Sequence, residues 1–201
     1  MDSDPRFQVQ RLGEAQIPSP LHLSTEHGDM IADYAEDDER VLLHTSLRSW
    51  REYTEKGIEP PSMEVAGPRQ KVYFDPKSAC AAIVTCGGLC PGLNDVIQGL
   101  VMALYYHYGV RRILGIRYGY YGLVDYNGEV PLALTPQEVA TIDTMGGSIL
   151  GSSRGNQNVV DMVDFLVRRG INILFTVGGD GTQRGALAIA EEVKRRSLDI
   201  A

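Results

Sequence analysis

The chain has 201 residues, of which 43% are hydrophobic and 22% are charged, a composition typical of a water-soluble globular protein. The formal net charge is −7 and no run of like charges occurs, which argues against a nucleic-acid or anionic-membrane surface because such surfaces need a basic patch. No apolar run is long enough to span a bilayer. A phosphate site in this chain would have to be built locally from backbone amides, a few arginines and a metal ion.

Residues 1–70 differ from the rest in being rich in proline and poor in regular apolar patterns. They predict an irregular N-terminal extension, with a short strand and a piece of helix between residues 40 and 53. We expect this extension to pack on a domain or a neighbouring subunit, and it shows no chemistry of its own. His22, His27 and His44 fall in this loop-like region without a shared face, which favours incidental histidines over metal ligands.

The three cysteines, Cys80, Cys86 and Cys90, do not form a C-x-x-C pair. They are expected to be free thiols in a reducing compartment. The chain starts with an acidic segment and has no apolar signal region, so a secretory signal is not expected. These features together predict a cytoplasmic protein.

Residues 71–201 alternate short apolar runs with amphipathic stretches, which predicts strands alternating with helices. The expected strands are 79–85, 111–116, 129–134 and 171–177, and the expected helices are 93–104, 135–143, 159–169 and 185–196. Asn94 or Asp95 is expected near the cap of the first helix. Short connections between such elements predict an α/β fold with a doubly wound, parallel (Rossmann-like) sheet. We predict that this sheet is incomplete at its C-terminal end.

Three glycine-containing turns are predicted at the carboxyl ends of strands, where ligands bind to sheets of this kind. They are Cys86–Gly92, Ser153–Gly155 and Gly178–Thr182. Two familiar phosphate motifs are missing, because the chain has no G-x-x-x-x-G-K-[ST] and its first turn is not G-x-G-x-x-G. The site must therefore differ from a P-loop and from a dinucleotide fingerprint.

The turn Gly178–Thr182 lies between an apolar strand and an alanine-rich helix, which is a favourable place for a phosphate. Asp180 would repel phosphates unless a divalent cation lay between them, and Mg²⁺ is the usual choice. The alternative is an ordinary turn in which Asp180 caps the helix. Arg154 is the cation expected to reach phosphate, since its fork can bind two oxygens; the alternative is a solvated surface arginine.

Four segments together carry a resemblance to a known family. TCGGLCPGLN (85–94), YGYYGL (118–123), GSSR (151–154) and GGDGT (178–182) resemble, in order and spacing, the N-terminal half of 6-phosphofructokinases. The first of these turns and the long N-terminal extension look like the long-chain group of plants, trypanosomes and some bacteria. The resemblance covers about residues 70–201.

The resemblance implies a glycolytic transferase of the cytoplasm that phosphorylates fructose 6-phosphate with ATP and Mg²⁺, and that assembles as a homodimer or homotetramer. Asp180 matches the family's Mg²⁺ ligand. The positions that match ATP-binding residues are Gly87, Arg154, Gly155, Gly179, Asp180, Gly181 and Thr182. Gly181 matches the position that decides the phosphoryl donor, because relatives that use pyrophosphate carry aspartate there. A carboxylate at that point would crowd and repel the α-phosphate of ATP, so glycine favours ATP.

The sequence departs from the family pattern in two respects. Short bacterial members have aspartate where Leu89 stands and an effector-binding arginine where Gln98 stands. The family is allosteric, but the resemblance therefore does not imply that ADP and phosphoenolpyruvate control this protein. The family's catalytic aspartate and sugar-phosphate arginines lie after the position of Ala201. The chain is therefore expected to carry the ATP and magnesium portion of a kinase and to be inactive alone.

Other functions stay open at this point. One is a truncated nucleotide-binding or regulatory subunit, which the missing catalytic base would explain. Another is a pyrophosphate-dependent phosphofructokinase, which Gly181 disfavours. A third is an NAD or lipid kinase with the same glycine–aspartate–glycine turn, but such kinases do not explain the turn at 86–92 or Arg154.

Overall fold

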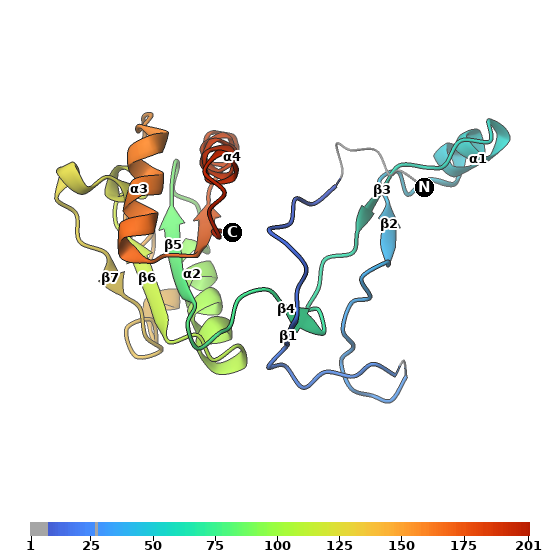
Figure 1. Cartoon of the computed structure of the whole chain (residues 1–201), viewed down its shortest axis with the longest axis horizontal. Helices are drawn as coiled ribbons and strands as arrows, with labels where there is room; N and C mark the ends of the chain where they lie inside the picture. The colour runs from blue at the N-terminus through green and yellow to red at the C-terminus, as the bar shows by residue number, and fades with distance from the viewer. Residues whose placement is uncertain (1–7, 27) are drawn as a thin grey trace. The chain divides into compact units, whose positions relative to one another are not determined.

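The computed structural model describes residues 8–26 and 28–201. The chain divides into two compact units, Met1–Tyr73 and Phe74–Ala201 (Figure 1). Each unit is described separately. Among the described residues, no helix is both long and apolar enough to cross a bilayer.

The first unit has little regular structure. Strand β1 (Ile17–Pro18) pairs antiparallel with β4 (Lys71–Val72), and β2 (Arg40–Leu42) pairs antiparallel with β3 (Ser62–Glu64). Helix α1 (Leu47–Glu55) follows β2 and has no buried residue. The predicted strand and helix piece between residues 40 and 53 are confirmed.

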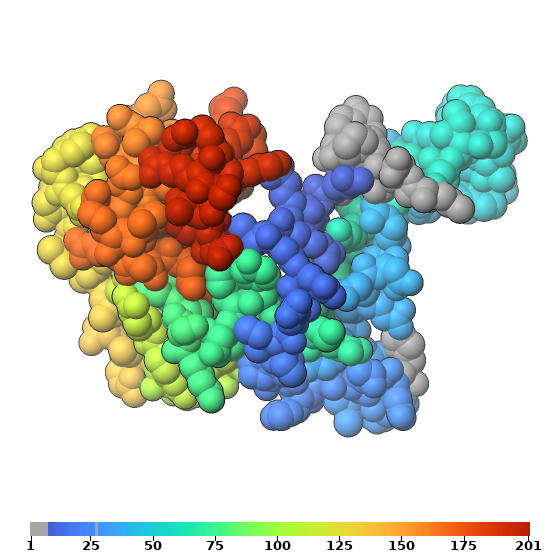
Figure 2. Space-filling view, viewed as in Figure 1, coloured from blue at the N-terminus to red at the C-terminus, as the bar shows by residue number. Residues whose placement is uncertain are grey.

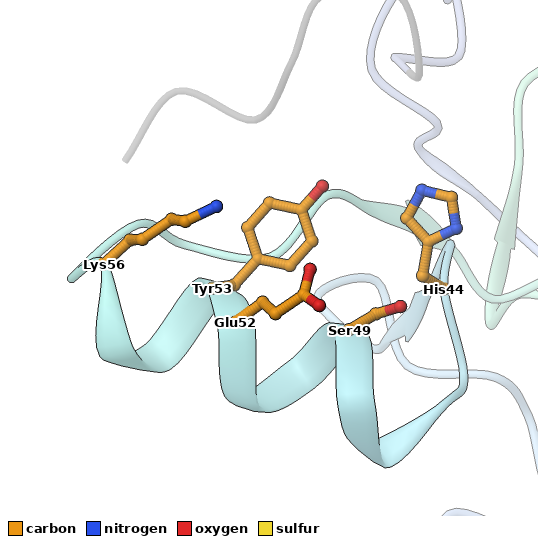
Figure 3. Close-up of a pocket in the computed structure, with 5 residues that line it drawn as sticks. All are labelled: His44, Ser49, Glu52, Tyr53 and Lys56. Carbon is orange, nitrogen blue, oxygen red and sulfur yellow. The ribbon is translucent and has the colours of Figure 1, made fainter.

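A shallow pocket of about 270 Å³ lies along α1 (Figure 3). Its lining is polar, and the side chains come from one face of the helix and the turn before it: His44, Ser49, Glu52, Tyr53 and Lys56. Part of this surface is already used within the unit. The Ser49 backbone N–H donates to Ser46 Oγ (3.1 Å), and Arg48 Nε donates to Glu52 Oε1 (3.1 Å). The pocket therefore lies where the chain caps and stabilises a short helix.

The second unit is built on a four-stranded sheet in the order β7-β6-β5-β8. The strands are β5 (Cys80–Thr85), β6 (Arg112–Ile116), β7 (Leu132–Ala133) and β8 (Ile173–Val177). Strand β5 pairs in parallel with both β6 and β8, whereas β7 pairs antiparallel with β6. The prediction of a parallel sheet is confirmed for three strands and wrong for β7.

The direction of β7 follows from the segment that precedes it. Between β6 and β7 the chain forms two short 3₁₀ helices, η3 (Gly119–Leu123) and η4 (Asp125–Asn127). Parallel strands need a crossover that passes over the sheet, usually an α-helix. No α-helix lies between β6 and β7, and the chain returns antiparallel to β6.

Helices cover both faces of this sheet (Figure 1), so the doubly wound architecture is confirmed. Helix α2 (Leu93–Met102), continued by a π-helical turn (Ala103–His107), packs on one face. Helices α3 (Val159–Arg169) and α4 (Asp180–Arg195) pack side by side on the other, as Figure 2 also shows.

Strand β5 explains why both faces are covered. All six of its residues are buried, as expected for a strand between two helical layers. Because side chains alternate along a strand, Ala81 and Ile83 join the apolar cluster of α2, while Ala82 and Val84 join that of α3 and α4. The center of the sheet is thus held from both sides.

One predicted helix is absent, and the predicted start of another is wrong. No α-helix forms over 135–143: residues 136–141 are turns, and a 3₁₀ helix covers Ile142–Thr144. Thr135 still makes the expected cap contact, because the Glu138 N–H donates to its Oγ1 (3.3 Å). Helix α4 begins at Asp180, five residues before the predicted start. The predicted helix 159–169 is confirmed, and it ends at Gly170 in the left-handed conformation (φ 61°).

Strand β8 lies at one edge of the described sheet. The Leu174 N–H donates to the Ala201 carbonyl (2.8 Å), and the Ala201 N–H donates to the Asn172 carbonyl (3.0 Å). Edge strands carry unpaired backbone groups. These two bonds satisfy part of the edge of β8.

Candidate functional site

The first turn leaves β5 at its carboxyl end and is anchored to two neighbouring segments. The Cys86 N–H donates to the Val177 carbonyl at the end of β8 (2.9 Å). Gly87 then adopts a positive φ of 84°, a conformation that glycine takes readily and side-chain-bearing residues avoid. The Gly87 N–H donates to the Ser153 carbonyl (3.3 Å), and Ser152 Oγ donates to the Gly87 carbonyl (2.6 Å).

The second segment, residues 148–155, is a loop and does not follow a strand. The prediction that Arg154 lies at a strand end is therefore wrong. Thr85, at the end of β5, holds this loop: its Oγ1 donates to the Gly151 carbonyl (2.8 Å) and lies 2.8 Å from Ser148 Oγ. Arg154 itself is exposed, and within the described chain its guanidinium forms no hydrogen bond or ion pair.

Asn94 lies in the first turn of α2, near the cap as predicted, but it is not the N-cap residue itself. The N-cap residue is Gly92 (φ 89°), with no side-chain cap bond. Asn94 is buried, donates through Nδ2 to the Met145 carbonyl (2.9 Å) and accepts from the Ile149 N–H (2.9 Å). Its amide thus ties the start of α2 to the segment that leads to Arg154. This is possible because an amide both donates and accepts.

The third turn joins β8 to α4 and depends on a close backbone approach. A Cβ at Gly178 would lie 2.6 Å from the Cys86 carbonyl oxygen and 2.8 Å from Thr182 Cβ. Only glycine fits this point without displacing the first turn. Gly179 is the N-cap residue of α4 and has no side chain to cap it.

The start of α4 is consequently open. The first N–H groups of a helix have no partner within the helix, and here no cap side chain takes them. Gly178, Gly179, Asp180 and Gly181 are all exposed. Asp180 is the first helical residue, and its carboxylate forms no hydrogen bond or ion pair within residues 8–26 and 28–201. The alternative in which Asp180 acts as the N-cap is not what the structure shows.

The contacts place the three predicted turns next to one another. Backbone amides with a partial positive charge, an unpaired carboxylate and an unpaired guanidinium are therefore available in one region of the second unit. Among the predicted site residues, Gly87 and Thr182 differ from the others. The Gly87 N–H is already bonded to Ser153, and Thr182 is buried, with its side chain against Gly178.

A magnesium ion would fit this donor set. Mg²⁺ is commonly held by one or two carboxylates together with water and the phosphates of a substrate, and not by a cage of protein ligands. The described residues contain no cluster of three or more metal-ligating side chains. The single unpaired carboxylate of Asp180 at an amide-rich helix start matches the first kind of site.

Cys86 supports the site without reacting in it. Burial raises the pKa of its thiol to about 11. The thiol therefore stays protonated at neutral pH and is a poor nucleophile. Cys80 is also a buried free thiol, whereas Cys90 is an exposed one.

Several residues that build the site could not be assigned from sequence. Ser152, Thr85 and Asn94 bond to backbone groups of segments distant in the chain. Gln98 is similar: its Nε2 donates to the carbonyls of Val139 (2.8 Å) and Ala140 (3.3 Å), so this amide is committed to internal bonds.

Comparison with known proteins identifies the family. The family model described as phosphofructokinase matches residues 80–200. The chain therefore belongs to the phosphofructokinase family. The resemblance inferred from the four motifs is confirmed, and the matched range includes all three turns of the candidate site.

Named relatives within the family are long proteins. ATP-dependent 6-phosphofructokinase of Amycolatopsis methanolica is 44% identical over 197 residues, which are 97% of this chain and 42% of that protein. The enzyme of the same name from Borreliella burgdorferi is 52% identical over 200 residues, 97% of this chain and 43% of that protein. That of Trypanosoma cruzi is 53% identical over 144 residues, 72% of this chain and 30% of that protein. The chain thus spans less than half the length of these relatives.

Solved phosphofructokinases share the fold. The crystal structure of Pichia pastoris phosphofructokinase in the T-state matches with a TM-score of 0.54 and 23% identity, over 71% of this chain and 17% of that one. A pyrophosphate-dependent phosphofructokinase from Marinobacter aquaeolei matches with a TM-score of 0.55 and 17% identity, over 61% of this chain and 31% of that one. At these identities the match supports the α/β architecture alone.

Proposed function

We propose that this chain carries the ATP- and magnesium-binding portion of an ATP-dependent 6-phosphofructokinase. That activity transfers the terminal phosphoryl group of ATP to the 1-hydroxyl of fructose 6-phosphate. The observation that carries the proposal is the uncapped start of α4, with an unpaired Asp180 carboxylate, next to the loop of Arg154. The names of the relatives agree with it.

In this proposal each group has a simple electrostatic role. Backbone N–H groups at the start of α4 bind phosphate oxygens, and the Arg154 fork holds two more. Asp180 holds Mg²⁺, which neutralises phosphate charge when bound. Phosphoryl transfer depends mainly on positioning and charge stabilisation. We place the sugar site and the general base in the part of the longer relatives that this chain does not cover.

Two further parts of the proposal concern the protein's setting. We place the protein in the cytoplasm, because free buried cysteines are typical of a reducing compartment. We also propose that the full-length protein is a homodimer or homotetramer.

Calorimetric titration of the chain with Mg-ATP tests the proposal. Saturable binding that disappears when EDTA removes magnesium is the expected result. A chain that is folded by circular dichroism but binds no Mg-ATP would contradict the assignment of the donor site to these residues.

Gly181→Asp tests why ATP is favoured over pyrophosphate. A Cβ at Gly181 meets no atom within 4 Å, so the aspartate should fit without disturbing the fold. A carboxylate close to a phosphate in a partly solvated site repels it by up to about 4 kcal/mol. We expect Mg-ATP binding to weaken roughly 100-fold by calorimetry.

Gly181→Asn is the matched control for this variant, since it has the same shape and no charge. It should lose clearly less affinity than Gly181→Asp. Equal losses would show that crowding, and not charge, excludes ATP. Unchanged affinity in Gly181→Asp would contradict the role of this position in donor choice.

Arg154→Lys tests the bidentate contact. Lysine keeps the charge but replaces the planar fork with a single ammonium group, and a charge-assisted hydrogen bond contributes about 1.5–3 kcal/mol. We expect Mg-ATP to bind about tenfold more weakly to Arg154→Lys and up to about 100-fold more weakly to Arg154→Gln. Lys194→Gln, at the far end of α4, removes the same charge and should leave affinity within about twofold.

A further inference from the structure

The side chain of Tyr120 connects the start of α4 to the rest of the site. Tyr120, in η3, is only 9% exposed. Its hydroxyl donates to the Thr182 carbonyl in the first turn of α4 (2.7 Å). Its ring packs against Gly185 so closely that a Cβ at Gly185 would lie 3.0 Å from Tyr120 Cζ.

The residue before Tyr120 and its own backbone contact the other two turns. A Cβ at Gly119 would lie 2.9 Å from Ser153 Oγ and 3.2 Å from Cys86 Sγ. The Tyr120 backbone N–H donates to Cys86 Sγ. This short stretch of η3 is therefore in contact with the turn after β5, the loop of Arg154 and the start of α4.

The contact with Thr182 requires that the Tyr120 hydroxyl be protonated. Burial raises the pKa of the hydroxyl well above its ordinary value of 10. It therefore stays protonated at neutral pH and donates to the carbonyl of Thr182. Because Thr182 follows Asp180 and Gly181 directly, a change in its position moves the exposed amides of the turn.

We propose that Tyr120 is a positioning residue of the nucleotide site, which it sets by bonding the start of α4 through its hydroxyl and by seating Gly185 on its ring. The inference rests on the proposed function. Tyr120 is not a catalytic residue, because its hydroxyl is already bonded to Thr182 in a buried environment. It acts on the ligand through the Gly179–Thr182 turn.

Tyr120→Phe tests the proposal, because it removes only the hydroxyl and leaves the ring against Gly185. Two quantities are measured on the full chain: hydrogen–deuterium exchange of the peptide that covers residues 178–184, and the dissociation constant of Mg-ATP. We expect exchange in this peptide to quicken severalfold and Mg-ATP to bind about tenfold more weakly, the effect of one lost hydrogen bond.

Val193→Ala is the control for a merely structural role. Val193 is buried in the same apolar cluster, at the far end of α4, so its truncation destabilises the unit without touching the turn. It should lower the unfolding temperature at least as much as Tyr120→Phe, with slow exchange at 178–184 and affinity within about twofold of the unsubstituted chain. Gly185→Ala displaces the Tyr120 ring from the opposite side and is expected to reproduce the Tyr120→Phe result.

The outcomes separate this inference from the proposed function. Unchanged exchange at 178–184 in Tyr120→Phe overturns the positioning role, whatever the chain binds. Faster exchange with unchanged Mg-ATP affinity overturns the link between this contact and the nucleotide. If the unsubstituted chain binds no Mg-ATP, the proposed function fails and so does the nucleotide link, while the exchange measurement still decides whether Tyr120 positions the turn.

Discussion

Replacing Gly178 with alanine is expected to lower the free energy of unfolding of the chain by about 3 kcal/mol and to abolish measurable Mg-ATP binding. The added Cβ would lie 2.6 Å from the Cys86 carbonyl oxygen, and a backbone atom cannot swing away as the end of a flexible side chain can. Overpacking of this kind typically costs 1–3 kcal/mol, and occasionally more. The turn after β5 and the start of α4 must move apart to relieve the contact.

Gly179→Ala is the matched control in the same turn. A Cβ at Gly179 meets no atom within 4 Å, and its φ of −85° is open to any residue. Its free energy of unfolding should stay within about 0.5 kcal/mol of the unsubstituted chain, as for most exposed substitutions. Denaturant unfolding followed by circular dichroism measures both variants. Equal stability of the two would mean that the β5 turn and α4 are not in close contact in solution.

The close approach at Gly178 also explains how much of this fold could be predicted. The strand before it and the helix after it are patterns of neighbouring residues, and the sequence predicts β5, β8 and α3 well for that reason. A glycine-rich turn predicts that another part of the backbone approaches closely. It does not say which distant backbone approaches, and Cys86 lies 92 residues from Gly178.

The segment 135–143 shows where local patterns mislead. Thr135 and Pro136 are a good helix start, yet no α-helix follows. A helix this short gains too few hydrogen bonds to form unless packing supports it. Here the Gln98 amide bonds the Val139 and Ala140 carbonyls, and Ile142 is buried in the α2 cluster. Tertiary contacts thus decide the conformation, and they are not encoded in the segment itself.

In the site, too, local patterns could be predicted from the sequence and contacts between distant segments could not. Exposed charges in glycine-containing turns could be predicted from sequence, as Asp180 and Arg154 were, although Arg154 does not follow a strand. Tyr120 lies in one of the four motifs, but its bond to Thr182, 62 residues away, depends on how the fold brings η3 to the start of α4. Thr182 is predicted beside the ligand, and the structure shows that its side chain is buried against Gly178.

The second large effect is expected at Asp180. Asp180→Asn keeps the shape of the side chain and removes its charge, so a magnesium ion held at this point loses its only carboxylate in the turn. Changes next to a metal already cost about 10–100-fold in affinity, and loss of a direct ligand should reach at least the upper end of that range. We expect Mg-ATP to bind about 100-fold more weakly. The affinity for ATP should then be nearly the same in magnesium as in EDTA.

The loss of binding must be separated from a general effect on the helix. An acidic residue in the first turn stabilises a helix by about 0.3–1 kcal/mol, so Asp180→Asn should also be slightly less stable. Asp161 occupies the first turn of α3, and Asp161→Asn loses the same helix term far along the chain from the turn. If only Asp180→Asn loses its magnesium dependence while both unfold alike, the carboxylate acts on the metal. If both bind Mg-ATP as the unsubstituted chain does, Asp180 is a helix-stabilising residue and magnesium is held by other groups.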